Sequence, residues 1–311
     1  MTSTQAPELA PTGVSRRGDQ VFAGLAKAAG VLILVALAGV AIFLTLEGAP
    51  AITAPEASMG GKSNIVLYVW PLLFGTLLAA FLAMLIATPL AFGVALVISH
   101  YAPRRMSKPV GYLIDLLAAV PSVVYGLWGI AFLGPRIVPF YSWLEDTLGF
   151  LPFFEGPATS GRTILTAAIV LAVMALPIIT AITREIFAQT PRLHEEAALA
   201  LGATRWEMIR MTVFPYSRSG MISATMLGLG RALGETMAVA MVLSATGVIT
   251  FNLISTTNPS TIAANIALQF GEASGTKINV LIFSGLVLFV ITFAVNFIAR
   301  AIVARSNVEE R

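Results

Sequence analysis

Six long apolar stretches restrict this chain to a helical membrane fold. They lie at about 22–46, 66–98, 110–133, 163–183, 217–244 and 278–300. A helix needs roughly 20 apolar residues to cross the hydrocarbon core of a bilayer, and each stretch reaches that length. Only 11% of the residues are charged, whereas soluble domains carry about 25%. We therefore expect an all-α membrane protein with six transmembrane helices.

The chain divides around these stretches. Residues 1–20 are rich in Pro, Ser and Thr, so we expect a disordered cytoplasmic tail. Arg16-Arg17 also resembles the start of a signal peptide, but the next apolar run is about twice the usual 7–15 residues, which favours an uncleaved span. We assign 21–64 to the first transmembrane helix and its outer loop, and 65–303 to the main transmembrane domain. Residues 304–311 form a second cytoplasmic tail.

The distribution of basic residues predicts the orientation in the membrane. With six spans, fourteen Lys and Arg residues fall on the inner segments and four on the outer segments. Basic residues flanking membrane helices concentrate on the cytoplasmic side. Both termini are therefore expected in the cytoplasm, and the net charge of +3 is explained by orientation without a nucleic-acid partner.

Two outer loops are long enough to have structure of their own. Residues 134–162 contain many aromatic side chains, and 245–277 include an apolar stretch around Ile262–Phe270. The aromatic residues fit a membrane-interface belt, and the apolar stretch fits a re-entrant or surface helix. The alternative interpretation is a docking surface for an extracellular partner.

A charged loop at 184–216 interrupts the apolar sequence. Residues 193–201 favour helix, Gly202 interrupts them, and 203–213 can resume a helix. Two helices joined at a glycine form a compact elbow, in which charged residues alternate with Leu, Met, Trp and Ile. Such a surface fits a groove on a soluble partner. An amphipathic connector would share the composition, but the spacing from Glu-Ala-Ala at 196–198 to the glycine favours docking.

A basic and an acidic residue lie inside the fifth apolar stretch. Arg231 and Glu235 are four residues apart, so a continuous helix would place them on one face. Each costs about 2.5–3.5 kcal/mol at the centre of a membrane helix, so the pair must face the bundle interior. The planar guanidinium is suited to a phosphate-like oxyanion, and Glu235 would hold it in place. The alternative is a structural ion pair that locks helices together.

Asp115 is a third candidate. It lies a few residues into the third stretch, where it either hydrates at the cytoplasmic interface or pairs with Arg231. Beyond it, Pro121 and Gly126 lie mid-span, and the carbonyl freed by a proline is tolerated only where protein or water satisfies it. A kink beside a polar cavity and an ordinary packed kink both fit.

Several other functions are excluded or disfavoured. The chain has no cysteine and two scattered histidines, which disfavours a metal centre. Gly61-Lys62-Ser63 lacks the first glycine of a phosphate-binding P-loop, because position 56 is Glu. No arrangement of nucleophile and base is present, so the chain is expected neither to bind ATP nor to be an enzyme.

The combined motifs resemble a known family. The segment from Glu196 to Pro215 resembles the cytoplasmic signature of ABC importer permeases, with Phe214 where leucine is common before the proline. PSVVYGLWGIAFLGP (121–135) and LGLGRALGETMAVA (227–240) resemble the phosphate-specific (Pst-type) system. The Thr-Met-Ala-Val ending is similar to its C-type permease, since the A-type usually has Ala-Pro there. The resemblance covers roughly 65–303.

The resemblance implies a type I importer of inorganic phosphate in the bacterial inner membrane. Its partners would be a second, A-type permease, two ATPase subunits and an extracytoplasmic phosphate-binding protein. ATP and Mg²⁺ would bind to the ATPase subunits, and this chain would hold no cofactor. The expected pathway residues are Arg231, Glu235 and Asp115, and the expected ATPase-coupling residues are Glu196, Ala197, Ala198, Gly202 and Pro215.

Three alternatives remain at this point. The first is a permease for another oxyanion, such as sulfate or molybdate. The second is a stand-alone, ion-coupled secondary transporter, which should show broken helices in matching halves of the chain; no convincing matched pair is present. The third is a structural membrane scaffold, against which the Arg231–Glu235 pair argues.

Overall fold

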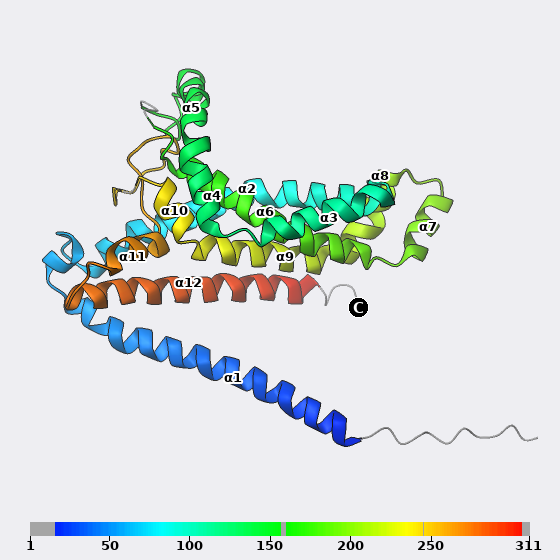
Figure 1. Cartoon of the computed structure of the whole chain (residues 1–311), viewed down its shortest axis with the longest axis horizontal. Helices are drawn as coiled ribbons and strands as arrows, with labels where there is room; N and C mark the ends of the chain where they lie inside the picture. Colours follow the sequence, from blue (N-terminus) through cyan, green and yellow to red (C-terminus); the bar gives the residue numbers. More distant parts are fainter. Residues whose placement is uncertain (1–15, 157–159, 245, 307–311) are drawn as a thin grey trace, which may run out of the picture.

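The computed structural model describes residues 16–156, 160–244 and 246–306, and their regular structure is almost entirely helical (Figure 1). Much of the predicted tail at 1–20 lies outside these ranges, and the first helix already begins at Arg16. The helices are α1 (Arg16–Gly48), α2 (Ile65–Leu96), α3 (Arg104–Ala118), α4 (Ser122–Trp128), α5 (Gly134–Leu148), α6 (Ile164–Ala188), α7 (Arg192–Ala200), α8 (Arg205–Met208), α9 (Phe214–Gly234), α10 (Met237–Val242), α11 (Ile262–Phe270) and α12 (Thr276–Ser306).

Three π-helical turns join neighbouring helices. They are Val97–Tyr101 after α2, Gly129–Leu133 between α4 and α5, and Ile209–Val213 between α8 and α9. The last two end two residues before a proline, Pro135 and Pro215. A proline ring clashes with the carbonyl of the preceding turn and cannot donate a backbone hydrogen bond. A wider π turn fits beside such a residue without ending the helix.

Five helical segments of the described chain are long and apolar enough to cross a membrane: Gly18–Thr53, Ile65–Tyr101, Ser122–Leu148, Ile164–Ala188 and Thr276–Ala301. All-α architecture is confirmed, but two of the six predicted spans differ. The predicted span at 110–133 is broken, because α3 ends at Ala118 and α4 begins after Pro121. The predicted span at 217–244 is also broken, because α9 ends at Gly234 and α10 has only six residues.

The core is built on α2 and α6, against which α9 packs. A seam of alanines on α2, each at most 1% exposed, makes this close approach possible: Ala79, Ala83, Ala87, Ala91 and Ala95. Their spacing of four residues keeps them on one helix face. Small residues let membrane helices approach closely, which strengthens van der Waals packing where lipid gives no hydrophobic driving force.

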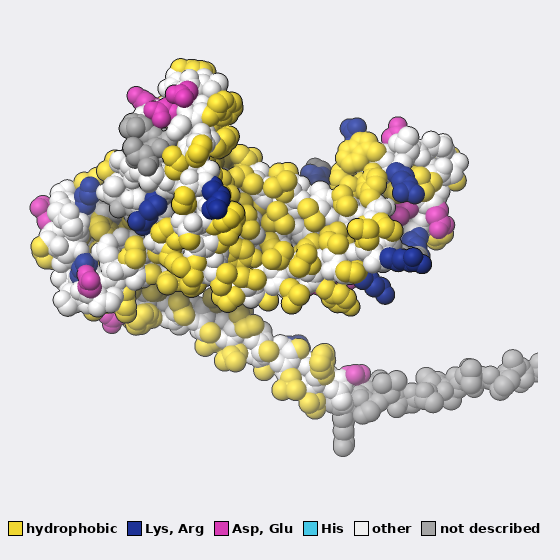
Figure 2. Space-filling view, turned by 45° about the horizontal axis from the view of Figure 1, so that its top comes forward, with side chains coloured by type: hydrophobic (Ala, Val, Ile, Leu, Met, Phe, Trp, Pro, Cys, Tyr) yellow, Lys and Arg dark blue, Asp and Glu magenta, His cyan; other side chains and the backbone are white. Residues whose placement is uncertain are grey.

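α1 is the least packed helix. The apolar window of its candidate span is 0% buried, and the helix diverges from the rest of the molecule in Figure 1, joined mainly to α12. Its N-terminal end, the α7–α8 region and the C-terminal end of α12 all lie toward the same end of the molecule. Figure 2 shows hydrophobic side chains across the middle of the visible face and charged side chains toward its two ends.

The opposite end is closed by loops and short helices. α11 begins at Ile262, as the apolar stretch predicts, and its first turns are buried against α2, where the Ile262 N–H donates to Thr76 Oγ1 at 3.0 Å. Asn258 is fully buried: its side chain accepts from the Ile164 N–H and donates to the carbonyls of Arg162 and Ser244. This one amide therefore joins three segments that are distant in sequence.

Candidate functional site

The elbow between α6 and α9 has the predicted glycine corner. Gly202 has a φ of +88°, a conformation that L-residues with a Cβ rarely adopt. The Gly202 N–H donates to the Leu199 carbonyl at 3.0 Å, and the Ala203 N–H donates to the Ala198 carbonyl at 3.2 Å. These two bonds form a Schellman motif, which satisfies carbonyls at the end of a helix and reverses the chain. The glycine therefore ends α7 and sets the angle of the elbow.

The second arm of the elbow begins with a capping box. The Thr204 hydroxyl accepts from the Glu207 N–H at 3.3 Å, and Glu207 Oε2 accepts from the Thr204 N–H at 2.8 Å. The backbone N–H and the hydroxyl of Thr204 hold the pKa of Glu207 below its ordinary value. Helical structure then continues without a break from Arg205 to Gly234. Pro215 therefore lies within this helix, which runs from the loop at 184–216 into the apolar stretch at 217–244.

The two faces of the elbow differ in character. Ala198, Met208 and Ile209 are buried with Phe187 of α6, so Ala198 faces the chain's own core. Glu196 and Ala197 are exposed. Large apolar side chains nearby are exposed as well: Leu193 at 79%, Leu201 at 87% and Trp206 at 53%. An exposed surface of this kind, beside a buried anchor, is a candidate for contact with another protein.

Contacts at the base of the elbow hold it to two transmembrane helices. His100 Nε2, in the π turn that follows α2, lies 3.6 Å from Glu195 Oε1 on α7. The rings of Trp206, Phe214, Phe187 and His100 form a continuous run of contacts, with successive centroids 6.0, 6.1 and 6.3 Å apart. The elbow is thus a packed extension of the transmembrane bundle.

The backbone between Arg231 and Glu235 is not a continuous helix. α9 ends at Gly234, and Glu235 follows in an extended conformation with ψ of 126°. Glu235 is buried, and its Oε1 accepts from the Ala238 N–H at 3.1 Å at the start of α10. No ion pair joins the two side chains, both of which are described. The prediction that they share one helix face as a pair is therefore wrong, because the glycine and the extended residue end the helix between them.

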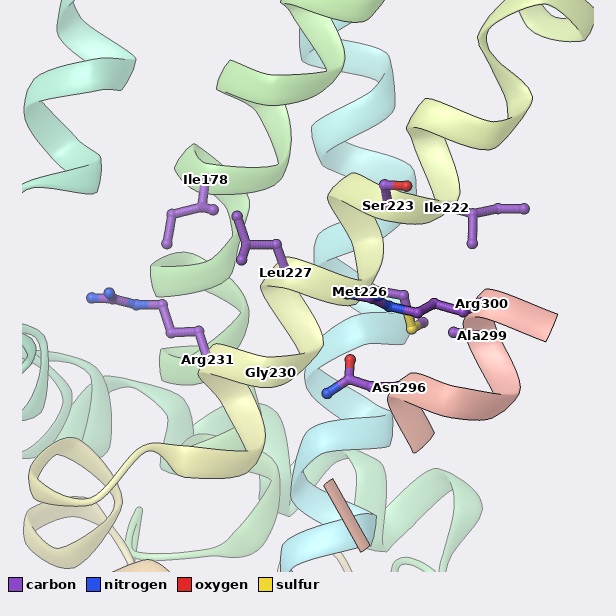
Figure 3. A pocket seen from close by; sticks show the side chains of 10 residues that line it. All are labelled: Ile178, Ile222, Ser223, Met226, Leu227, Gly230, Arg231, Asn296, Ala299 and Arg300. Carbon is purple, nitrogen blue, oxygen red and sulfur yellow. The ribbon is translucent and has the colours of Figure 1, made fainter. Parts of the chain in front are cut away.

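Arg231 instead lines a cavity of about 770 Å³ between α6, α9 and α12 (Figure 3). Its Nε is buried and has no hydrogen-bond partner. A buried donor without a partner costs about 1–3 kcal/mol, more for a charged group. The other lining residues are Ile178, Ile222, Ser223, Met226, Leu227, Gly230, Asn296, Ala299 and Arg300. Among the described residues, the lining therefore has two guanidinium groups and no carboxylate.

Asp115 lies elsewhere. Its Oδ2 is 3.5 Å from Nη2 of Arg184, at the elbow end of α6. Gly111, one turn before Asp115, leaves the space that the Arg184 guanidinium occupies, since a Cβ there would overlap Nη1. Asp115 is half-exposed and borders a second, smaller cavity with Lys108 and Glu185. The possible Asp115–Arg231 pair is not formed.

Asn296 and Arg300 were missed as candidates from the sequence. They are four residues apart in the last apolar stretch, so they share one face of α12. Two polar side chains on one face of a membrane helix are a detectable signal. The orientation rule accounts for Arg300 as one of the basic residues on the inner side and does not single out Asn296.

Known proteins resemble the chain over most of its length. Residues 87–308 match the family described as "Binding-protein-dependent transport system inner membrane component". The chain is 46% identical over 301 residues to "Phosphate transport system permease protein PstC 2" of Mycobacterium bovis, covering 93% of this chain and 92% of the relative. It is 40% identical to "Phosphate transport system permease protein PstC" of Xylella fastidiosa, covering 100% and 99%.

Solved structures support the same assignment at the level of fold. A bacterial alginate ABC transporter in complex with an alginate-bound periplasmic protein superposes with a TM-score of 0.64 at 15% identity, covering 93% of this chain and 96% of that one. At this identity the likeness concerns the fold alone. Together with the sequence matches, it confirms the resemblance to ABC importer permeases. The chain belongs to the family of binding-protein-dependent transport system inner membrane components, and is thus a transporter subunit and not an enzyme.

Proposed function

We propose that this chain is the transmembrane permease subunit of an ATP-driven importer of inorganic phosphate. The observation that carries the proposal is the Arg231 guanidinium: within the described part of the chain, its Nε is buried without a partner, and no carboxylate lines the cavity beside it. An arginine fork donates two parallel hydrogen bonds to a tetrahedral oxyanion. Relatives that cover nearly the whole chain are named as phosphate permeases.

Glu235 has an indirect role in this proposal. Its carboxylate caps the first turn of α10 and so positions the backbone immediately after Arg231. A carboxylate that does not pair with the guanidinium leaves it available to the anion. Asp115 is now a candidate for holding α3 against α6 through Arg184, outside the pathway.

The elbow is the proposed docking site for an ATPase subunit. Glu196 and Ala197 lie on its exposed face beside Leu193 and Leu201, while Gly202 shapes the corner. Ala198 and Pro215 would contribute to the shape of the elbow: Ala198 packs in its buried base, and Pro215 lies in the helix that continues from it. The complex would contain a second permease, two ATPase subunits that bind ATP and Mg²⁺, and an extracytoplasmic phosphate-binding protein. The N-terminal end of α1, the C-terminal end of α12 and the elbow lie toward the same end of the molecule (Figure 1). Since the elbow is proposed to face the cytoplasm, this arrangement supports cytoplasmic termini.

The test is phosphate uptake by the purified complex in vesicles. Arg231→Gln should abolish or sharply reduce uptake at equal complex abundance, and Arg231→Lys should restore only part of it, because lysine keeps the charge and loses the fork. Arg218→Gln is the matched control, since Arg218 is exposed on the same helix and outside the cavity. Near-normal uptake by Arg231→Gln would show that this residue does not carry transport.

Competition and energy source separate the remaining alternatives. If unlabelled sulfate or molybdate displaces labelled phosphate more strongly than phosphate itself does, the substrate is another oxyanion. If uptake persists without the ATPase subunits and follows an ion gradient, the chain is a secondary transporter.

A further inference from the structure

The cavity beside Arg231 has a second cationic residue on its opposite side. In Figure 3 the Arg231 side chain extends from α9 away from α12, whereas Asn296 and Arg300 of α12 lie on the other side of α9, where they also line the cavity. Asn296 and Arg300 are one helical turn apart. The cavity is therefore lined by donors from two antiparallel helices, and only the donor on α9 has a role so far.

The charges around this cavity favour an anion. Among the described residues, neither Arg231 nor Arg300 forms an ion pair with a carboxylate. The Ser223 hydroxyl donates to the Ser219 carbonyl at 2.9 Å, so its proton is already used. The side-chain donors that remain in the lining are the two guanidinium groups and the Asn296 amide, and the lining residues that the structure describes include no acidic group.

The two arginines lie at different depths. Arg231 is three residues from the end of α9 that lies away from the elbow, and Arg300 is in the last part of α12, whose C-terminal end lies toward the elbow. The cavity follows α9 from Ile222 to Arg231, which is about 13 Å at 1.5 Å per residue. That length has room for successive anion positions.

We propose that Asn296 and Arg300 form a second oxyanion-binding position, nearer the elbow than Arg231, from which the anion leaves the cavity. The inference rests on the proposed function and adds a specific exit position to it. A single strong site would retain its anion, whereas several weaker sites in sequence let it enter and leave. Arg300 supplies the fork that a phosphate-type group prefers, and the Asn296 amide adds a donor one helical turn away on the same face of α12.

The phosphate group recognised by Arg300 has two possible sources, the transported anion and a lipid headgroup. Long basic side chains near helix ends extend toward the membrane interface, where anionic headgroups would meet the guanidinium. The two sources predict different effects of the lipid composition on transport. An exit position affects transport whatever the lipid, whereas a headgroup contact depends on the anionic lipid present.

The experiment measures uptake of labelled inorganic phosphate by the complete complex in two kinds of vesicle. One contains phosphatidylcholine alone and the other contains added phosphatidylglycerol. Arg300→Gln should lower the maximal rate about tenfold in both, as expected for loss of one hydrogen-bonded charge. Arg300→Lys should recover part of the rate, and Asn296→Ala should lower it less. The control is Arg218→Gln, which removes an exposed charge near the same end, outside the cavity.

A second readout separates binding from folding. Inorganic phosphate on the elbow side should slow uptake by occupying the exit position, and Arg300→Gln should raise the concentration required about tenfold. The exit position is overturned if Arg300→Gln is normal at equal abundance, or if its defect appears only with phosphatidylglycerol. If the exit position is overturned in this way but Arg231→Gln is inactive, the proposed function is kept and only the exit position is rejected. If the wild-type complex carries no phosphate, both proposals fall.

Discussion

Gly202 provides a direct test of the elbow. It has a φ of +88°, and a Cβ built on it would have nothing within 4 Å. Replacement by alanine therefore meets no steric obstacle, and its cost is the backbone conformation alone. That cost is about 1–2 kcal/mol for a residue with a Cβ, or about a 5- to 30-fold change in an equilibrium constant at 1.4 kcal/mol per factor of ten.

A series of substitutions grades this strain. Gly202→Asn should cost least, because asparagine tolerates the left-handed conformation better than other side chains. Gly202→Ala should weaken ATPase binding about 5- to 30-fold if the elbow relaxes when undocked and must recover its shape to dock. Gly202→Pro should abolish association, because proline fixes φ near −65° and removes the N–H that donates to Leu199.

The assay is titration of the purified permease pair with its ATPase, followed by phosphate uptake at matched abundance. Membrane insertion should be unchanged in every variant, because Gly202 lies outside the transmembrane helices. Glu196→Lys, at an exposed position on α7, should lose association through charge with no backbone strain. Wild-type affinity in both Gly202→Pro and Glu196→Lys would refute docking through the elbow.

Three further predictions concern other parts of the molecule. Reporter fusions at Phe150 and at the C-terminus should give outside and inside signals respectively; the opposite result would overturn the orientation. Because the pKa of Glu207 is lowered, its cap stabilises the elbow above the ordinary carboxyl pKa of 4.5 and is lost as the pH falls through the lowered pKa. Amide exchange at residue 207 should therefore accelerate over that pH range in the wild type, and Glu207→Gln should show no such acceleration. Asn258→Ala should destabilise the protein by about 3 kcal/mol, because three hydrogen bonds are lost, although the Arg162 carbonyl still accepts from the Ser244 N–H; an unchanged thermal midpoint would contradict this.

The elbow could be predicted from the sequence because its determinants are local. A helix-favouring run, a glycine and a resumed helix define it, and the structure places the glycine at the corner. The apolar stretch at Ile262–Phe270 was likewise sufficient to predict α11. In both cases the signal lies within one continuous segment, 193–213 for the elbow and Ile262–Phe270 for α11, and needs no tertiary information.

The arrangement around Arg231 could not be predicted in the same way. A spacing of four residues implies a shared face only if the helix continues, and the extended backbone at Glu235 depends on loops and α10 packed from elsewhere. The Asp115–Arg184 pair joins α3 to α6, a tertiary contact that spacing does not specify. The sequence predicts a kink at Pro121, but the effect in the structure is larger: α3 and α4 are separate helices.

One helix physically connects the two proposed functional regions. Helical structure is continuous from Arg205 in the elbow to Gly234, three residues beyond Arg231, a length of about 45 Å at 1.5 Å per residue. The ring contacts between Trp206, Phe214 and Phe187 hold the elbow end of this helix. Its other end stops at the extended Glu235. A helix of this length transmits a displacement along its axis more directly than two helices joined by a loop. Under the proposed function, movement of the elbow by an ATPase therefore acts on the position of Arg231 through this one helix, which can bend at its π turn and at Pro215.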